Sequence, residues 1–204
     1  MSETIRLLLA DDQALVRGAL AALLDLESDL QVVAQVGRGD EVVDAARAAG
    51  AHVCVLDIEM PGMDGIDAAA QVSATLSGVR SLIVTTFGRP GYLRRAIGAG
   101  ASGFVVKDTP AAELADAVRR VHAGLRVVDP TLATESLTSG ENPLTPRESD
   151  VLTEALSGGT VAAIAARVHL SQGTVRNHLS AAIGKTGTST RAEAARVAHE
   201  RGWI

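Results

Sequence analysis

Five polar side chains stand at the ends of apolar runs, and their types suit phosphoryl chemistry. The run IRLLLA leads into Asp11 and Asp12, HVCVL into Asp57 and GFVV into Lys107, while RSLIVT ends in Thr85. If these ends meet, three carboxylates crowd one cleft and repel one another unless a cation shares them. Mg²⁺ suits such a cleft because it binds a few hard oxygens and keeps several waters. Asp57 could then attack a phosphoryl group and hold it as an acyl phosphate, with Thr85 hydrogen-bonded to a phosphoryl oxygen.

Each of these residues also has a plainer explanation when taken alone. An aspartate at the end of a strand is usually a cap or turn residue. Asp11 and Asp12 could simply cap the helix that follows and favour its dipole. A lone lysine before Asp-Thr-Pro is usually solvated. Chance alone seldom places all of them at strand ends, so the phosphoryl hypothesis is the stronger one.

The elements that would position these residues alternate between strands and helices. Five short apolar runs indicate strands: IRLLLA, LQVVAQV, HVCVLD, RSLIVTT and SGFVVK. Helical spacing lies between them, and Leu15, Ala19, Leu20, Leu23 and Leu24 are expected to line the inner face of the first helix. The alternation predicts an α/β domain, a doubly wound five-stranded parallel sheet covered on both faces. With the flavodoxin-like strand order 2-1-3-4-5, the polar strand ends would share one edge of the sheet.

Composition changes after the last of these elements. Residues 124–143 are rich in Pro, Gly, Ser, Thr and acidic residues, which is typical of a linker. Residues 144–204 contain four short helical patterns and no strand pattern. We therefore expect an α/β domain over 1–123, a linker over 124–143 and a small all-α domain over 144–204. Lys and Arg number 12 against 18 Asp and Glu in residues 1–140, a charge of −6, and 7 against 6 in residues 141–204, a charge of +1.

The uneven charge indicates two modules with different partners, although +1 is too little to predict nucleic-acid binding by itself. The single cysteine, Cys54, excludes an internal disulfide, fits a reducing compartment and is expected to be buried packing. The segment MSETIRLLLADD is neither a signal peptide nor long enough to span a membrane. A cytoplasmic protein without a membrane partner is the expectation.

The phrases LLLADDQ, VLDIEMPGMDG, IVTTF and GASGFVVKD make residues 5–123 resemble the receiver domain of bacterial two-component response regulators. The resemblance implies phosphorylation by a sensor histidine kinase and binding of Mg²⁺. It differs from many receivers in that Asp108, and not proline, follows the lysine. By this resemblance the phosphoacceptor is Asp57, the metal ligands are Asp12, Asp57 and the backbone carbonyl of Glu59 with Asp11 close by, and the switch residues are Thr85, Lys107 and the aromatic Phe104.

The rear module has the pattern of a helix-turn-helix. Thr145, Pro146 and Glu148 form a cap, a first-turn proline and a capping-box glutamate. A second helix is expected from about Val161 to Val168, and Ser171 would cap the third. On that third helix the buried stripe would be Val175, Leu179 and Ile183, which turns Arg176, Asn177 and Ser180 outward. An ordinary solvated face would have the same pattern.

This segment resembles the LuxR-type DNA-binding domain, and the two modules together resemble NarL/FixJ-type regulators. The resemblance implies that Ser171 to Lys185 is the recognition helix and that double-stranded promoter DNA is the partner. Arginine can pair with guanine and asparagine with adenine in the major groove. Two positions differ from the family, Ala163 in place of glutamate and Thr186 in place of leucine. The expected DNA contacts are Ser171, Thr174, Arg176, Asn177, Ser180 and Lys185.

The combined prediction is a transcriptional response regulator that is phosphorylated on Asp57 and dimerises to bind DNA, and that is not an enzyme with an external substrate. Two alternatives remain at this point. Glu59, two residues after Asp57, could be the general acid of a dehalogenase-type phosphatase, although no cap insertion is visible. The chain could also be a DNA-binding protein that works without phosphorylation.

Overall fold

The computed structural model describes residues 4–86, 88, 90–130, 132–134 and 142–204. Contacts between Cα atoms divide the chain into two compact units. The first comprises Met1–Gly88 and Leu93–Ala133, and the second comprises Arg89–Tyr92 and Thr134–Ile204. Among the described residues, no helix combines the length and the apolar composition needed to cross a bilayer.

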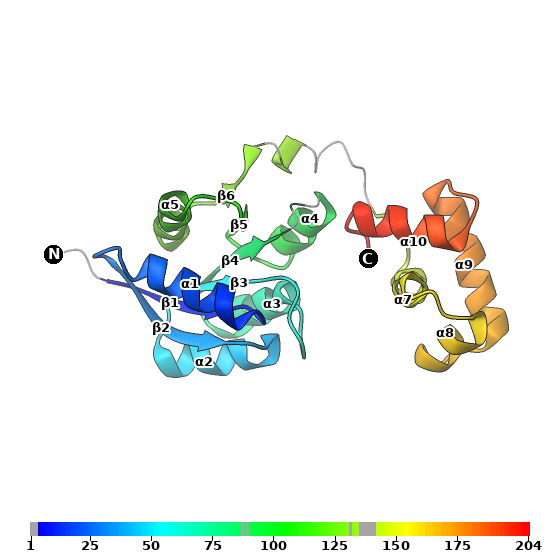
Figure 1. Cartoon of the computed structure of the whole chain (residues 1–204), viewed down its shortest axis with the longest axis horizontal. Coiled ribbons are helices and arrows are strands. Elements are labelled where there is room, and N and C mark those ends of the chain that lie inside the picture. The colour runs from blue at the N-terminus through cyan, green and yellow to red at the C-terminus, as the bar shows by residue number, and fades with distance from the viewer. Residues whose placement is uncertain (1–3, 87, 89, 131, 135–141) are drawn as a thin grey trace. The chain divides into compact units, whose positions relative to one another are not determined.

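The first unit is a parallel sheet with helices on its faces (Figure 1). Every strand pair is parallel, and the strand order is β2-β1-β3-β4-β5-β6. The predicted order 2-1-3-4-5 is therefore confirmed. The strands are β1 (Ile5–Ala10), β2 (Leu30–Val36), β3 (Val53–Leu56), β4 (Arg80–Thr85), β5 (Gly103–Val106) and β6 (Val127–Val128). The helices are α1 (Ala14–Leu24), the 3-10 turn η1 (Gly39–Glu41), α2 (Val42–Ala49), α3 (Gly65–Thr75), α4 (Pro90–Gly98), of which Leu93–Gly98 belong to this unit, and α5 (Ala111–His122).

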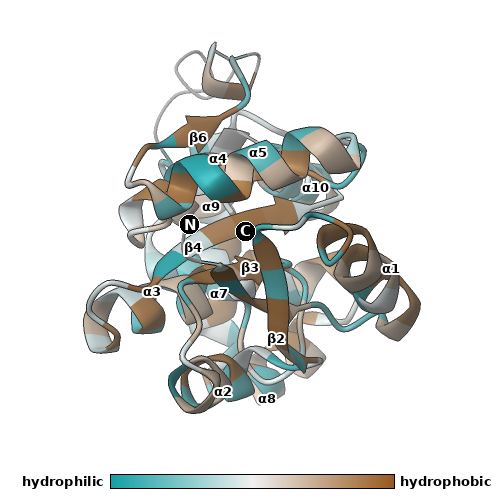
Figure 2. Cartoon of the chain, turned by 90° about the vertical axis from the view of Figure 1, so that its left-hand side faces the viewer, coloured by the Kyte–Doolittle hydropathy of each residue, from teal (hydrophilic) through white to brown (hydrophobic). Residues whose placement is uncertain are grey.

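The central strands β3 and β4 are largely buried and apolar (Figure 2), because helices cover both faces of the sheet, whereas the edge strand β2 is mostly half-buried. All four residues of β3 are buried, including Cys54, as the sequence predicts. Alternate residues of the strands face the core that α1 and α5 complete. Asp57 follows β3 directly, and its backbone N–H donates to the carbonyl of Ala10 at the end of β1 at 2.8 Å. The strand ends are therefore tied together at the edge where the polar residues lie.

Two features differ from the expectation. The sixth strand, β6, lies within the predicted linker and pairs with β5, so the sheet has six strands where the sequence predicts five. A strand of two residues is too short to give a periodic signal. The predicted inner face of α1 is wrong in part, because Leu15 is 86% exposed and Leu23 44% exposed while Ala21 and Leu24 are buried. The helix ALVRGALAALL is apolar on nearly all sides, so its spacing does not determine which face packs inward.

Over residues 142–204 the second unit is all helical, and it has its own core. Its helices are α7 (Pro146–Leu156), α8 (Val161–Arg167), α9 (Gln172–Thr186) and α10 (Arg191–Glu200). Each begins with a hydroxyl N-cap that accepts from the backbone N–H three residues on, and the caps are Thr145, Thr160, Ser171 and Thr190. Val151, Leu152, Ile164, Val175 and Trp203 are among the residues that form the core. The linker residues 135–141 lie outside the described part of the chain.

Candidate phosphoacceptor pocket and DNA-binding helix

The structure brings three of the predicted polar strand ends into direct contact. Lys107 Nζ lies 2.9 Å from Asp57 Oδ2, to which it donates a hydrogen bond, and 2.8 Å from Asp11 Oδ2. The Asp11 contact is an ion pair by distance but does not have hydrogen-bond geometry. The other Asp57 oxygen, Oδ1, accepts the backbone N–H of Ile58 at 2.8 Å. Asp11, Asp57 and most of Lys107 are buried.

Asp12 completes a cluster of three carboxylates. One ligand atom from each of Asp11, Asp12 and Asp57 lies within 4.8 Å of the others, and Asp12 is the exposed member. Three acids against one lysine leave a formal excess of two negative charges, and Asp11 Oδ2 is buried without a hydrogen-bond donor. A divalent cation with oxygen ligands would balance this charge and use these oxygens. The residues present therefore fit the predicted magnesium site.

The electrostatics of the pocket follow from this imbalance. Burial raises the pKa of Asp57, and the negative charge of Asp11 adds to the effect, while the contact with Lys107 only partly opposes it. Burial acts to lower the pKa of Lys107, but its pairing with Asp11 and Asp57 outweighs burial and raises it. The lysine stays protonated and the aspartate is held in an unfavourable setting that added positive charge would relieve.

The remaining predicted residues of the first unit lie on β4 and β5 and in the loop that follows Asp57. Thr85 ends β4 and is buried, and its carbonyl accepts the backbone N–H of Lys107 at 2.8 Å. Phe104 is fully buried in β5 opposite Ile83. Glu59 is exposed in the loop after β3. The peptide between Lys107 and Asp108 is trans, like the other described peptides.

Glycines allow the loop around Asp57 to pack closely. A side chain at Gly65 would collide with the backbone carbonyl of Asp57, and one at Gly39 would collide with the carbonyl of Met63. The backbone N–H of Gly39 also donates to the carbonyl of Pro61 at 3.2 Å. The loop after β2 is therefore packed directly against the loop that carries Asp57.

The predicted recognition helix is α9. Ser171 caps it by accepting from Thr174 N–H at 3.1 Å, and the two hydroxyls lie 2.8 Å apart. Val175 and Leu179 are buried, Ile183 is half-buried, and Ala182 joins them in the core. Arg176, Asn177 and Ser180 are exposed, on the side of α9 turned away from that core.

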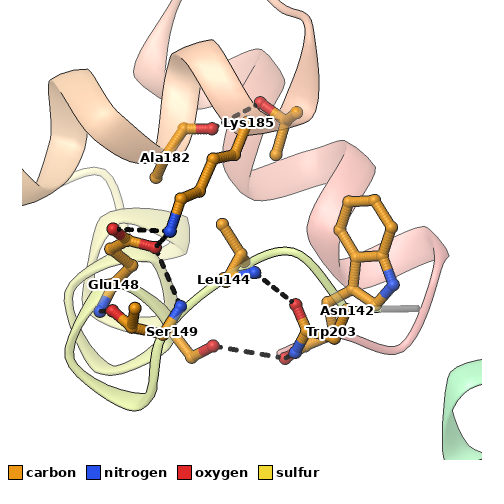
Figure 3. Close-up of polar contacts among 9 residues, drawn as sticks. Asn142, Leu144, Glu148, Ser149, Ala182, Lys185 and Trp203 are labelled. Carbon is orange, nitrogen blue, oxygen red and sulfur yellow. Dashed lines mark hydrogen bonds and ion pairs between the residues drawn. The ribbon is translucent and has the colours of Figure 1, made fainter.

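Lys185, near the C-terminal end of α9, has a partner inside the domain (Figure 3). Its Nζ donates to both carboxylate oxygens of Glu148, at 3.0 and 2.7 Å. Glu148 is the third residue of α7 and forms the predicted capping box with Thr145. Burial acts to raise the pKa of Glu148, but the hydrogen bonds from Lys185 and Thr145 and the positive charge of Lys185 outweigh burial and lower the pKa.

Comparison with known proteins identifies both units. Residues 7–119 match the model of the response regulator receiver domain, and residues 142–198 match that of the bacterial regulatory proteins of the luxR family. The chain is 44% identical to the uncharacterized transcriptional regulatory protein YvfU of Bacillus subtilis over 98% of its length and all of YvfU. The chain belongs to the LuxR-type response regulators.

Two further similarities cover the whole chain. The transcriptional regulatory protein DesR of Bacillus subtilis is 42% identical to this regulator over 98% of the chain and 99% of DesR. A crystal structure of the response regulator ChrA of a heme-sensing two-component system superposes with a TM-score of 0.60 at 32% identity and covers all of both chains. The response regulator is thus a two-domain transcriptional regulator, and the phosphatase alternative is not supported.

Two contacts of this regulator are not predicted by its sequence. Arg17 of α1 donates from its guanidinium to the backbone carbonyl of Asp11, which ties α1 to the acidic strand end. Lys185 pairs with Glu148, 37 residues away along the chain. For Arg17 the signal is weak, because an arginine in a helix is usually solvated. For Lys185 the burial of the capping-box glutamate is the relevant signal, since a buried carboxylate requires a cationic partner.

Proposed function

We propose that Asp57 is the phosphoacceptor of this response regulator, that Mg²⁺ bound by Asp11, Asp12 and Asp57 assists the reaction, and that a sensor histidine kinase supplies the phosphoryl group. The observation that carries the proposal is the contact of Lys107 with both Asp11 and Asp57 at the strand ends. Thr85, Phe104 and the backbone carbonyl of Glu59 complete the proposed set. The regulator is proposed to act in the cytoplasm.

The proposed reaction is a displacement at phosphorus. A carboxylate oxygen of Asp57 forms the new P–O bond as the bond between phosphorus and the donor's imidazole nitrogen breaks, and the electron pair leaves with the imidazole. The metal, when bound, supplies positive charge to the phosphoryl oxygens. Lys107 then transfers its hydrogen bond from Asp57 to a phosphoryl oxygen, which stabilises the product. The reaction modifies the chain itself and does not turn over an external substrate.

The output is proposed to be binding of promoter DNA by a phosphorylation-induced homodimer. Arg176 and Asn177 would read base edges in the major groove, with Ser171, Thr174 and Ser180 beside them. Their exposure on one side of α9 supports this assignment. Lys185 belongs to the predicted set of DNA contacts but differs from the others, because its ammonium contacts Glu148. With a charge of only +1 in residues 141–204, a single domain should bind weakly, so pairing two copies is the proposed source of affinity.

A binding experiment on three proteins tests this proposal. The isolated residues 142–204, the full chain and the full chain treated with acetyl phosphate and Mg²⁺ are titrated with duplexes that the treated chain selects from a random library. Tight binding is expected only for the treated chain. Alanine at Arg176 or Asn177 should cost about 1–3 kcal/mol on the selected duplex and little on scrambled DNA. If the isolated domain binds as tightly as the treated chain, the receiver is not the switch.

A further inference from the structure

We propose that Lys185 is a positioning residue of the recognition helix, and that its ammonium fixes the C-terminal end of α9 on the first turn of α7 through Glu148 instead of contacting DNA phosphate. The inference rests on the proposed DNA binding by α9 and deepens it, because it assigns the orientation of that helix to one ion pair. Glu148 and Lys185 lie on different helices and are 37 positions apart in the chain, so their contact is purely tertiary.

The two side chains differ in their access to solvent. Glu148 is 8% exposed, and Lys185 is 37% exposed, with its Nζ directed to both carboxylate oxygens (Figure 3). Glu148 Oε2 also accepts the backbone N–H of Thr145 at 2.8 Å. The carboxylate is thus held on one side by the start of α7 and on the other by the lysine. A positive charge at the end of α9 and a negative one at the start of α7 also suit the two helix dipoles.

Two of the three N–H groups of the Lys185 ammonium are given to Glu148, so a full contact with DNA phosphate would draw the ammonium away from that carboxylate. The buried carboxylate would then lose its counter-charge, and an uncompensated buried charge is strongly unfavourable. Arg176 has no such constraint, since its guanidinium is exposed and its hydrogen bond is to Gln172 of the same helix at 3.4 Å. Arg176 can therefore exchange its partner for a base, whereas the ammonium of Lys185 is needed to balance the charge of Glu148 within the domain.

Local hydrogen bonds and a left-handed glycine close the C-terminal end of α9. Thr186 Oγ1 donates toward the carbonyls of Ala182 and Ile183, at 2.9 and 3.1 Å. Gly187 ends the helix in the left-handed conformation with φ of 68°. These contacts join Thr186 to the last turn of α9. A displacement of Lys185 relative to α7 should therefore tilt α9 as a whole.

The experiment compares Lys185→Met, Glu148→Gln and the double variant in the full chain treated with acetyl phosphate and Mg²⁺. Glutamine at 148 keeps an oxygen for the N–H of Thr145 and removes only the charge, so the capping box is preserved. The probes are the duplex selected by the wild-type chain and a scrambled duplex of the same length. Affinity is measured over a range of salt concentrations, and circular dichroism at the same temperature confirms that each variant is folded.

If Lys185 positions the helix, each single variant should weaken binding to the selected duplex by about 3- to 30-fold, and the double variant should be no weaker than the poorer single one. Binding to the scrambled duplex and the salt slope should stay as in the wild type, and Lys185→Arg should restore binding. Arg196→Met removes an exposed ion pair with Glu200 on α10 and serves as the matched control, with no change expected.

The opposite results would overturn the proposal. A phosphate contact predicts that Lys185→Met weakens both duplexes alike and lowers the salt slope by about one, whether residue 148 is glutamate or glutamine. If Glu148→Gln does not fold, the salt slope of Lys185→Met alone decides between the two roles. Failure of the wild-type chain to select any duplex would overturn the proposed function and this inference with it, whereas additive single effects would overturn the inference alone.

Discussion

Both domains of this regulator contain a lysine that contacts a buried carboxylate, but the pKa values of the two carboxylates are shifted in opposite directions. Lys107 faces two buried acids, Asp11 and Asp57, and the pKa of Asp57 is raised by burial and by the neighbouring charge. Lys185 faces one, Glu148, whose pKa is lowered because its partners outweigh burial. An excess of negative charge characterises a site prepared for a cation and a reaction, whereas a balanced pair characterises a contact that holds helices together.

The largest expected effect comes from substitution of Asp57, the proposed nucleophile of the site in the first domain. Asp57→Asn replaces the nucleophilic oxygen by an amide and should abolish labelling by acetyl phosphate while the fold is retained. Mass spectrometry of the intact protein measures the adduct, and Glu148→Gln, which removes the balanced carboxylate, should be labelled like the wild type. An undiminished adduct on Asp57→Asn would contradict the assignment of the phosphoacceptor.

Substitution of Lys107 should separate phosphorylation from the dimerisation that follows it. Lys107→Ala is expected to permit some phosphorylation and to abolish the dimerisation that follows, because the ammonium no longer contacts the new phosphoryl group. Thr85→Ala should behave in the same way, since it lacks the hydroxyl proposed to bind a phosphoryl oxygen. Light scattering of treated and untreated protein measures dimerisation. A normal response of both variants would rule out the proposed switch.

The excess of negative charge in the cluster of Asp11, Asp12 and Asp57 can be tested by measuring its affinity for Mg²⁺. Asp12→Ala removes the exposed carboxylate of the cluster and should weaken Mg²⁺ binding about tenfold, which corresponds to about 1.4 kcal/mol. Isothermal titration calorimetry measures the affinity without any phosphoryl donor. Asp150→Ala is a suitable control, because that exposed acid lies on α7, in the other domain. Equal affinities of wild type and Asp12→Ala would exclude Asp12 as a ligand.

The smallest expected effect is on the free energy of unfolding, which ionisation of Asp57 and ionisation of Glu148 should change in opposite directions. A raised pKa in the folded state means that ionised Asp57 destabilises the fold as pH rises above the ordinary aspartate value of 3.8. A lowered pKa means that ionised Glu148 stabilises the fold above its ordinary value of 4.5, and that this contribution is lost as pH falls through the lowered value. At pH 7 without Mg²⁺, Asp57→Asn should therefore raise the stability of the first domain.

In the second domain Glu148→Gln should lower stability at pH 7 by about 1–2 kcal/mol, and the difference from wild type should vanish at low pH. Calorimetry records the unfolding of both domains, and the transition that tryptophan fluorescence does not follow is assigned to the first domain. Fluorescence of Trp203, the single tryptophan, which is buried in the second domain, reports on that one. The exposed pair Arg196–Glu200 should contribute well under 1 kcal/mol. Shifts of the same sign in both variants would remove the distinction between the two sites.

The sequence predicts the strand order and the meeting of Asp11, Asp57 and Lys107 because parallel strands present their carboxyl ends at one edge. It also predicts the capping box of α7, whose residues are three apart. It does not predict that Lys185 pairs with Glu148, since helical spacing rules extend over only a few residues. The sequence also does not predict which face of α1 is buried or that β6 forms. Neither feature has a distinctive local pattern, and tertiary packing decides both.

The backbone carbonyl of Trp203 accepts hydrogen bonds from Asn142 Nδ2 at 3.1 Å and Ser149 Oγ at 3.5 Å, so the two ends of the DNA-binding domain are adjacent (Figure 3). A domain whose ends meet can be closed into a ring and opened elsewhere. A short peptide from Ile204 to Asn142, with new termini cut between Gly158 and Gly159 in the turn after α7, would give a circular permutant that keeps the fold. In that permutant the start of α7 would be joined through the new peptide to Ile204 instead of to the linker from the receiver domain.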